Sequence, residues 1–297
     1  MKLLYRLTER TSNYLWFEIR QREGIQFCCL KKEEVKMAES ESVLYQETNG
    51  IALITLNRPE ALNALSIAVL ERLSALLDKV KASDPAKAVI FTGSGKAAFS
   101  AGADIQYLSQ ATPLGVREFS RLALRVNHQI ETLGKLVVAA INGYALGGGL
   151  ELAESCMIRI AVRNARLGHP EVKIGAVAGF GGTTRLARLV GRGRAAELLL
   201  RGRVIAADEA LQIGLIQSVV EPENLLAEAT TFVNDVLAQS PIAVKLTWEA
   251  LHRGLNMTLE ESTALGADSF GLVASTEDFH IGTKAFLEKK KPMYTGK

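Results

Sequence analysis

A run of glycines and a nearby carboxylate form the part of this sequence best suited to chemistry. Gly147, Gly148 and Gly149 follow a short apolar run at residues 136–141 and lead into a helix-like segment that carries Glu151. Glycine lets the backbone approach a ligand closely, and the first N–H groups of a helix have no partner inside the helix. This stretch predicts a site for an anion or for an oxygen that becomes negative. A tight strand-to-helix packing turn is the simpler alternative.

A second carboxylate completes a candidate acid/base pair. Glu171 follows Gly168, His169 and Pro170 in a neighbourhood with few charges. Two carboxylates around one water can act as acid and base when their environments separate their pKa values. We therefore expect Glu151 and Glu171 to work together, although for any two of the 32 acidic residues ordinary surface solvation is the alternative.

A loop of small residues provides a further candidate. It spans residues 99–105 and follows a predicted strand at 88–92. Its backbone could supply another N–H group to the same oxygen. Alone, however, it would be an ordinary turn in which Asp104 caps a helix.

Motifs for other common chemistries are absent or incomplete. The chain has no dinucleotide-binding GxGxxG, no phosphate-binding Walker loop, no GxSxG elbow and no HExxH helix. His169 and Glu171 match half of a zinc deaminase motif, but no PCxxC follows them. The four histidines are dispersed, so we interpret them as core or surface residues. The three cysteines form no disulfide framework or metal knuckle, and we expect no bound metal.

Hydrophobic patterns predict an α/β core. Short apolar runs at residues 50–56, 88–92, 136–141 and 157–162 are typical of buried strands, and apolar residues at helical spacing over 70–80 predict a helix. From Arg185 onward the patterns are mostly helical. Amphipathic runs lie at residues 223–237, 242–252 and around 285–287. We expect a catalytic core at 42–235 and a C-terminal helical region at 236–297.

Composition and charge narrow the function classes. The chain is 48% hydrophobic and 23% charged, which excludes a disordered protein. The first 36 residues carry eight basic and five acidic side chains, which accounts for the net charge of +3, and the rest is balanced. A nucleic-acid binder should show an excess of basic residues, and the part of the chain after residue 36 shows none overall. No apolar run approaches the roughly 20 residues that span a bilayer, so we expect a soluble cytoplasmic protein.

Residues 1–36 differ from the rest. They lack the features of a secretory signal or transit peptide, and a second methionine, Met37, follows them. We expect an extension or leader outside the core, weakly ordered if it is retained. A partner-binding arm is the alternative.

Five motifs in order resemble the crotonase, or enoyl-CoA hydratase/isomerase, superfamily. They are NRPEALNALS (57–66), AFSAGADI (98–105), INGYALGGGLELA (141–153), GHPEVKIGAVAGFGGTTRLARLVG (168–191) and AFLEKKKP (285–292). The resemblance covers about Ser42 to the C-terminus. It implies a spiral of repeated ββα units and a C-terminal helical region that packs in a trimer. Two trimers usually form a hexamer in this superfamily.

The resemblance also implies an activity. Enoyl-CoA hydratases add water reversibly across the 2,3 double bond of a 2-enoyl-CoA and give a 3-hydroxyacyl-CoA. The backbone N–H groups of Ala103 and Gly148 would form the oxyanion hole, Glu151 would activate water, and Glu171 would move a proton at the α-carbon. No metal or redox cofactor is implied, because CoA arrives as part of the substrate.

The expected contacts with CoA follow from the same resemblance. The positions that match are Ala61, Leu62, Ala101, Gly102, Asp104, Ile105, Phe286 and Lys289. The chain departs from several short-chain hydratases at Leu150, where they carry cysteine. The motifs leave acyl-chain length, stereochemistry and pathway open.

Two alternatives accompany the hydratase interpretation. A Δ3-Δ2 enoyl-CoA isomerase or another crotonase-type lyase would use the same oxyanion hole, but such relatives commonly lack one of the two acids. RNA binding is the alternative from another class of function. Its candidate residues are Arg185, Arg188, Arg192, Arg194, Arg201 and Arg203. We expect that run to form a solvated or inter-subunit face.

Overall fold

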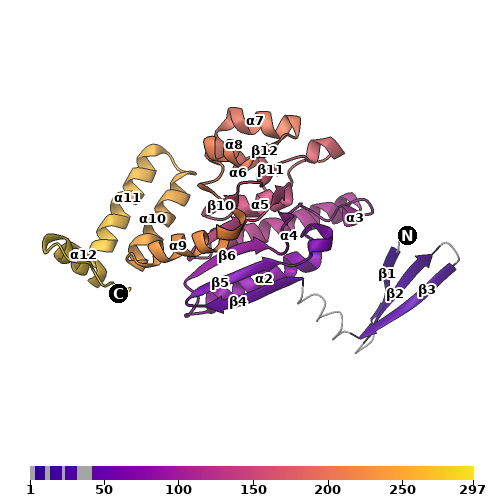
Figure 1. Cartoon of the computed structure of the whole chain (residues 1–297), viewed down its shortest axis with the longest axis horizontal. Coiled ribbons are helices and arrows are strands. Elements are labelled where there is room, and N and C mark those ends of the chain that lie inside the picture. The colour runs from indigo at the N-terminus through magenta and orange to yellow at the C-terminus, as the bar shows by residue number, and fades with distance from the viewer. Residues whose placement is uncertain (1–3, 11–13, 22–23, 32–41) are drawn as a thin grey trace.

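The computed structural model describes residues 4–10, 14–21, 24–31 and 42–297 (Figure 1). Near the N-terminus, β1 (Leu4–Arg10), β2 (Tyr14–Gln21) and β3 (Gly24–Lys31) form an antiparallel sheet of their own. From the sequence we expected an extension or leader there, weakly ordered if it is retained, and these strands were not predicted. The aromatic and β-branched residues of this segment favour extended structure. The exclusion of this segment from the catalytic core stays a prediction.

A six-stranded sheet forms the larger layer of the core. Its order is β13-β10-β8-β6-β5-β4, and all neighbours are parallel except β4 and β5. The strands are β4 (Val43–Thr48), β5 (Ile51–Leu56), β6 (Ala88–Gly93), β8 (Leu136–Ile141), β10 (Ile158–Val162) and β13 (Ser218–Val220). The four strands predicted from apolar runs are β5, β6, β8 and β10. Parallel strands that are covered on both faces read as continuous apolar runs, which is why these four could be recognised.

A four-stranded sheet of short strands forms the second layer, in the order β12-β11-β9-β7. Its strands are β7 (Ala98–Ser100), β9 (Tyr144–Leu146), β11 (Arg166–Gly168) and β12 (Val204–Ala206). Three successive stretches of chain place one strand in the large sheet and the next in the small sheet before a helical segment follows. These stretches are β6-β7, β8-β9 and β10-β11. The expected repetition of ββα units is therefore confirmed.

Helices link and cover the strands. They include α2 (Ile67–Ala82), α3 (Ile105–Leu108), α4 (Pro113–Glu131), α5 (Gly148–Glu154), α6 (Gly182–Val190), α7 (Arg192–Arg201) and α8 (Ala207–Gln212). In α2 the buried residues follow the predicted spacing, and the Ser66 side chain caps the first turn by accepting the N–H of Val69. The stretch from Arg185 onward is mostly helical, as expected, but it also contains β12 and β13, which were not predicted. Each has three residues, too few for a periodic signal.

The chain ends in four helices, α9 (Leu225–Leu237), α10 (Pro241–Gly254), α11 (Leu259–Ala274) and α12 (Glu277–Leu287). In Figure 1, α10, α11 and α12 extend to one side of the two core sheets. Pro241 and the Ser240 side chain start α10, because Ser240 accepts the N–H of Ala243. Among the described helices, none combines the length and apolarity needed to cross a membrane.

Asn63 fastens the loop before α2 to the strands of the core. It is 1% exposed and adopts a φ of +56°, in the left-handed region that asparagine tolerates better than most residues. Its Nδ2 donates to the carbonyls of Ser94, at 3.0 Å, and Ala98, at 2.7 Å. Its Oδ1 accepts the N–H of Arg58 at 2.9 Å. One side chain therefore fixes this loop against β6 and β7.

We expect Asn63→Ala to lower the free energy of unfolding by about 1–3 kcal/mol, because the Ala98 carbonyl would stay buried without its partner. Urea denaturation would measure the change. Asn234→Ala is the matched control, because Asn234 is exposed on α9. The control should change stability by less than about 0.5 kcal/mol. Equal effects of the two substitutions would contradict the role of Asn63.

Candidate active site

Glu151 lies in the interior, in the first turn of the short helix α5. The chain enters this helix through Gly147, whose φ of +48° and ψ of −124° are disfavoured for residues with a Cβ. Glu151 is only 1% exposed. Its Oε1 accepts two hydrogen bonds, from the N–H groups of Phe180 and Gly182, each at 2.7 Å. The carboxylate is thus held in one position by backbone donors of a different segment.

The surroundings of Glu151 prepare it to exchange a proton near neutral pH. Burial raises the pKa of Glu151 to about 7, against the lowering effects of the Gly182 N–H and of His169. The neighbouring Glu154 and Glu171 carboxylates raise the pKa further. A carboxylic acid with a pKa close to neutral is suited to general acid–base catalysis.

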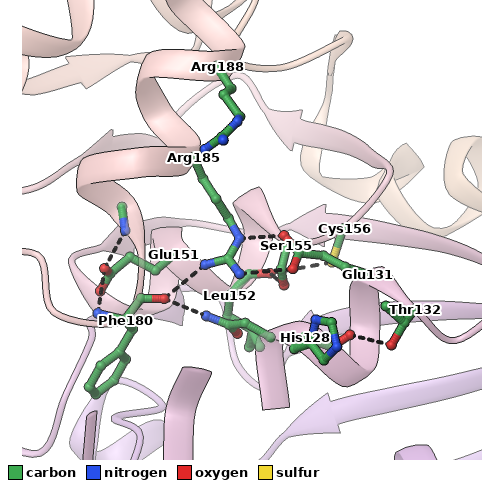
Figure 2. A network of polar contacts seen from close by, with 12 residues as sticks. His128, Glu131, Thr132, Glu151, Leu152, Ser155, Cys156, Phe180, Arg185 and Arg188 are labelled. Atoms are coloured by element: carbon green, nitrogen blue, oxygen red, sulfur yellow. Dashed lines mark hydrogen bonds and ion pairs between the residues drawn. The ribbon is translucent and has the colours of Figure 1, made fainter. Parts of the chain in front are cut away.

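A polar network fixes the turn that holds Glu151 (Figure 2). The Phe180 carbonyl accepts hydrogen bonds from Asn127 Nδ2, at 3.0 Å, and from Arg185 Nη1, at 2.9 Å. Arg185 in turn forms a two-pronged ion pair with Glu131, with distances of 2.6 and 3.0 Å. The two N–H groups that reach Glu151 are therefore anchored from the opposite side of their turn.

Glu171 follows β11 and approaches Gly147, at the start of α5. It opens the short 3-10 helix η2 (Glu171–Ile174), directly after Pro170. A Cβ on Gly147 would lie 2.8 Å from Glu171 Oε1, so a side chain there would push this carboxylate aside. The side chain of Glu171 is 15% exposed, and its Oε2 has no partner among the described residues. Glu171 therefore keeps one buried carboxylate oxygen without a partner among the described residues.

The two predicted backbone donors lie side by side. A Cβ on Gly148 would be 3.3 Å from the backbone nitrogen of Ala103, and a Cβ on Gly102 would be 3.3 Å from the nitrogen of Gly148. Within the described part of the chain, neither the Ala103 nor the Gly148 N–H donates to a backbone acceptor. The arrangement can hold one oxygen that carries negative charge.

The loops predicted to contact CoA join one another beside these donors. Ala101 N–H donates to the Leu62 carbonyl at 2.9 Å, and Ala103 bridges to Leu65 as in a parallel sheet. Arg58 and Asp104 form an ion pair at 3.2 Å. The structure therefore brings together the predicted residues Ala61, Leu62, Ala101, Gly102, Ala103, Asp104 and Ile105. Leu62 and Ile105 expose 41% and 57% of their surface there.

The other two predicted CoA contacts lie elsewhere in the single chain. Phe286 is 84% exposed on α12, and Lys289 follows that helix. In Figure 1, α12 lies beyond α10 and α11 on one side of the core sheets, and α3 lies on the other side. One chain therefore does not bring Phe286 or Lys289 to the oxyanion donors, and their contact with CoA stays a prediction.

The sequence analysis missed two functional candidates beside Glu171. His169, interpreted as a dispersed histidine, is 1% exposed, and its Nε2 lies 2.9 Å from Glu154 Oε1. His169 Nδ1 lies 3.7 Å from Glu171 Oε1. The available signal was the position of His169 two residues before a predicted catalytic acid. Nothing in the sequence paired it with Glu154.

The arginines considered for RNA binding are largely occupied within the chain. Arg194, Arg201 and Arg203 pair with Glu197, and Arg203 also pairs with Glu209. Arg185 pairs with Glu131, and Arg188 donates to Asn256. These contacts favour a structural role for the run over phosphate binding.

Comparison with known proteins shows the family of the chain. The Enoyl-CoA hydratase/isomerase family model matches residues 46–297. The short-chain-enoyl-CoA hydratase of Clostridium acetobutylicum is 43% identical over 253 residues, which cover 85% of this chain and 97% of that protein. The crotonyl-CoA hydratase of Syntrophomonas wolfei is 41% identical over 257 residues, which cover 86% of this chain and 99% of that protein.

The chain is also similar to solved structures of enoyl-CoA hydratases. The crystal structure of an enoyl-CoA hydratase from Bacillus anthracis matches with a TM-score of 0.83 at 37% identity and covers 86% of this chain and 100% of that one. An enoyl-CoA hydratase from Geobacillus kaustophilus matches with a TM-score of 0.82 at 36% identity, covering 86% of this chain and 98% of that one. The chain therefore belongs to the enoyl-CoA hydratase/isomerase family.

Proposed function

We propose that this protein is an enoyl-CoA hydratase, which adds water reversibly across the 2,3 double bond of a 2-enoyl-CoA. The observation that carries the proposal is the convergence of two free N–H groups and two carboxylates around Gly147 and Gly148. The relatives named short-chain-enoyl-CoA hydratase and crotonyl-CoA hydratase support it.

The backbone donors stabilise the charge that forms during the reaction. When a water oxygen bonds to C3, the electrons of the double bond move toward the thioester oxygen and give an enolate. The N–H groups of Ala103 and Gly148 hold that oxygen. Preorganised donors of this kind contribute on the order of 100- to 1000-fold each to the rate.

The two carboxylates move the protons. Glu151 accepts a proton from the attacking water as the hydroxyl bonds to C3, and Glu171 gives a proton to C2. The product gains one hydroxyl and one hydrogen, so the atoms of one water are accounted for. Hydration changes no overall oxidation state, and we propose that the enzyme uses neither a redox cofactor nor a metal. CoA enters as part of the substrate.

We expect Glu151→Gln and Glu171→Gln each to lower kcat by about 10²- to 10⁴-fold, because each removes one proton transfer. Loss of the conjugated enoyl-thioester absorbance with crotonyl-CoA would measure the rate. Glu228→Gln, at an exposed position on α9, is the matched control and should keep full activity.

Two results would count against hydration. One is a folded wild-type protein that consumes neither crotonyl-CoA nor a longer 2-enoyl-CoA. The other is a gain of conjugated absorbance when a 3-enoyl-CoA is supplied, without hydration of the 2-enoyl product. The second result would favour the Δ3-Δ2 isomerase, which needs to move a single proton between C4 and C2.

The pH dependence follows from Glu151. Since its pKa is raised to about 7, Glu151 is protonated at lower pH and cannot accept a proton from water. We expect kcat/KM for hydration to fall about tenfold per pH unit below that value. A pH–rate profile of the wild type would test this. An acidic limb near pH 4 to 5, the ordinary range of a glutamate, would contradict the assignment.

We also propose that the chain works as a trimer or as a hexamer of two trimers. The C-terminal helices expose large apolar side chains, among them Leu259 at 83% and Phe270 at 68%, which a neighbouring copy could cover. A neighbouring copy could also bring Phe286 and Lys289 to CoA. Sedimentation equilibrium should give three or six times the chain mass of 32.2 kDa. A monomer at micromolar concentration would contradict this proposal.

A further inference from the structure

A buried histidine lies between two glutamates at the edge of the site. His169 Nε2 is 2.9 Å from Glu154 Oε1, and its Nδ1 is 3.7 Å from Glu171 Oε1. His169 Nδ1, Glu154 Oε2 and Glu171 Oε2 are all buried atoms that lack a hydrogen-bond partner among the described residues. Buried polar atoms are rarely left unpaired, so this cluster calls for an explanation beyond packing.

We propose that His169, held by Glu154, is a positioning residue that orients Glu171 and stabilises its carboxylate during hydration. This inference rests on the proposed hydratase function. It assigns a role to Glu154 and His169 that the two-carboxylate mechanism does not include.

The backbone around His169 is fixed on both sides. Gly168 pairs with Leu146 and with Val204 in the small sheet, and its carbonyl accepts the N–H of Gly147 at 2.9 Å. Pro170 restricts the chain between His169 and Glu171. The imidazole therefore cannot shift far without disturbing the strand that leads to the catalytic acid.

The imidazole ring is also packed against the turn that holds Glu151. A Cβ on Gly182 would lie 2.7 Å from His169 Cε1 and 3.1 Å from Glu151 Oε1. Because Gly182 has no side chain, the His169 ring and the Glu151 carboxylate can both pack against its backbone. His169 consequently lies close to both catalytic carboxylates.

The charge of His169 suits this role. Burial alone lowers the pKa of His169, but Glu154, together with the Glu171 and Glu151 carboxylates, raises it to about 10. The ring is therefore an imidazolium at neutral pH once Glu171 has given up its proton, because the Glu171 carboxylate is one of the groups that raise the pKa of His169. Among the described residues, two other cations interact with the carboxylates of α5. Arg185 on α6 is already paired with Glu131 of α4, and Arg159 on β10 donates to the carbonyls of Leu215 and Cys156. His169 is thus the cation that faces Glu171.

The reaction makes use of this cation. When Glu171 gives its proton to C2, a negative charge forms on its carboxylate, and a fixed positive charge nearby stabilises that charge. The separation of 3.7 Å in the free protein is too long for a hydrogen bond. Catalytic contacts of this kind often shorten when substrate binds.

The test measures kcat, KM and the pH profile of kcat/KM for crotonyl-CoA hydration. We expect His169→Gln to lower kcat by about 10- to 100-fold and to change KM by less than about threefold, because the acid is misplaced while the oxyanion donors are intact. Its acidic limb should move to higher pH, since His169 lowers the pKa of Glu151. His128→Gln, at an exposed position, is the control.

Glu154→Gln tests the partner of His169. Without the Glu154 carboxylate the pKa of His169 should fall, because that carboxylate raises it. We expect the imidazolium to be lost at a lower pH than in the wild type, so the ratio of wild-type to Glu154→Gln kcat should grow as the pH rises. A histidine that only fills space would leave this ratio independent of pH.

A double variant separates function from folding. His169→Gln leaves Glu154 buried without its cation, which could destabilise the fold. Glu154→Gln with His169→Gln replaces the pair by two neutral amides, and it should recover most of the thermal stability while kcat stays low. Recovery of kcat together with Tm would overturn the proposal.

The outcomes distinguish this inference from the function on which it rests. An active wild type beside a folded His169→Gln variant with wild-type kcat and an unmoved acidic limb overturns the role of His169 alone. A wild type that hydrates no 2-enoyl-CoA overturns the proposed function, and this inference with it.

Discussion

The backbone at residues 147–149 packs directly against other segments of the chain, and the rest of the active site depends on this close packing. A Cβ on Gly149 would lie 2.3 Å from the Ser100 carbonyl, and one on Gly148 would lie 2.8 Å from the Phe180 ring. A Cβ on Gly147 would meet Glu171. Three segments that are distant in sequence therefore meet at a turn that has no room for side chains. Without these contacts, the oxyanion donors and the acids would not share one site.

The two-layer sheet arrangement explains why those segments meet. In the small sheet β9 lies between β7 and β11, so the residues that follow each strand emerge at one edge. Ala103 comes shortly after β7, Gly148 after β9, and Glu171 after β11. Each repeated unit thus delivers one reactive group to the same edge. The helix α5 then carries Glu151 three residues beyond Gly148, which ties the proposed base to the proposed oxyanion donor.

The sequence predicts the large sheet better than the small one. The apolar run at 136–141 marks β8 with correct bounds, whereas β9 and β11 have three residues each and no recognisable period. The placement of the site therefore depends on strands that only tertiary pairing reveals. Glu151 and Glu171 could be named because glycine and proline mark their loops. The amides of Phe180 and Gly182 could not, since any residue carries a backbone donor.

The contact between Glu154 and His169 is another feature that could not be predicted from the sequence. The two residues are 15 positions apart, and their contact depends on how α5 faces the end of β11. No local sequence pattern predicts which side of α5 faces the end of β11. Phe286 and Lys289 illustrate the reverse case, because family motifs mark them while a single chain leaves them on α12, far from α3. A motif marks a position without placing it in space, whereas the structure shows where one chain puts that position.

The electrostatics of the site work against stability in favour of reactivity. A pKa raised from 4.5 to about 7 means that ionised Glu151 destabilises the folded state, on the order of 3 kcal/mol if its unfolded value is ordinary. The sign is opposite for His169, whose raised pKa makes the imidazolium stabilising below about pH 6.5 and progressively less so up to about pH 10. The positive charge of His169 therefore offsets part of the destabilisation of the folded state that the buried carboxylates cause. A site with two apolar residues in place of His169 and Glu154 would avoid burying that pair, but it would leave Glu171 with no cation beside it.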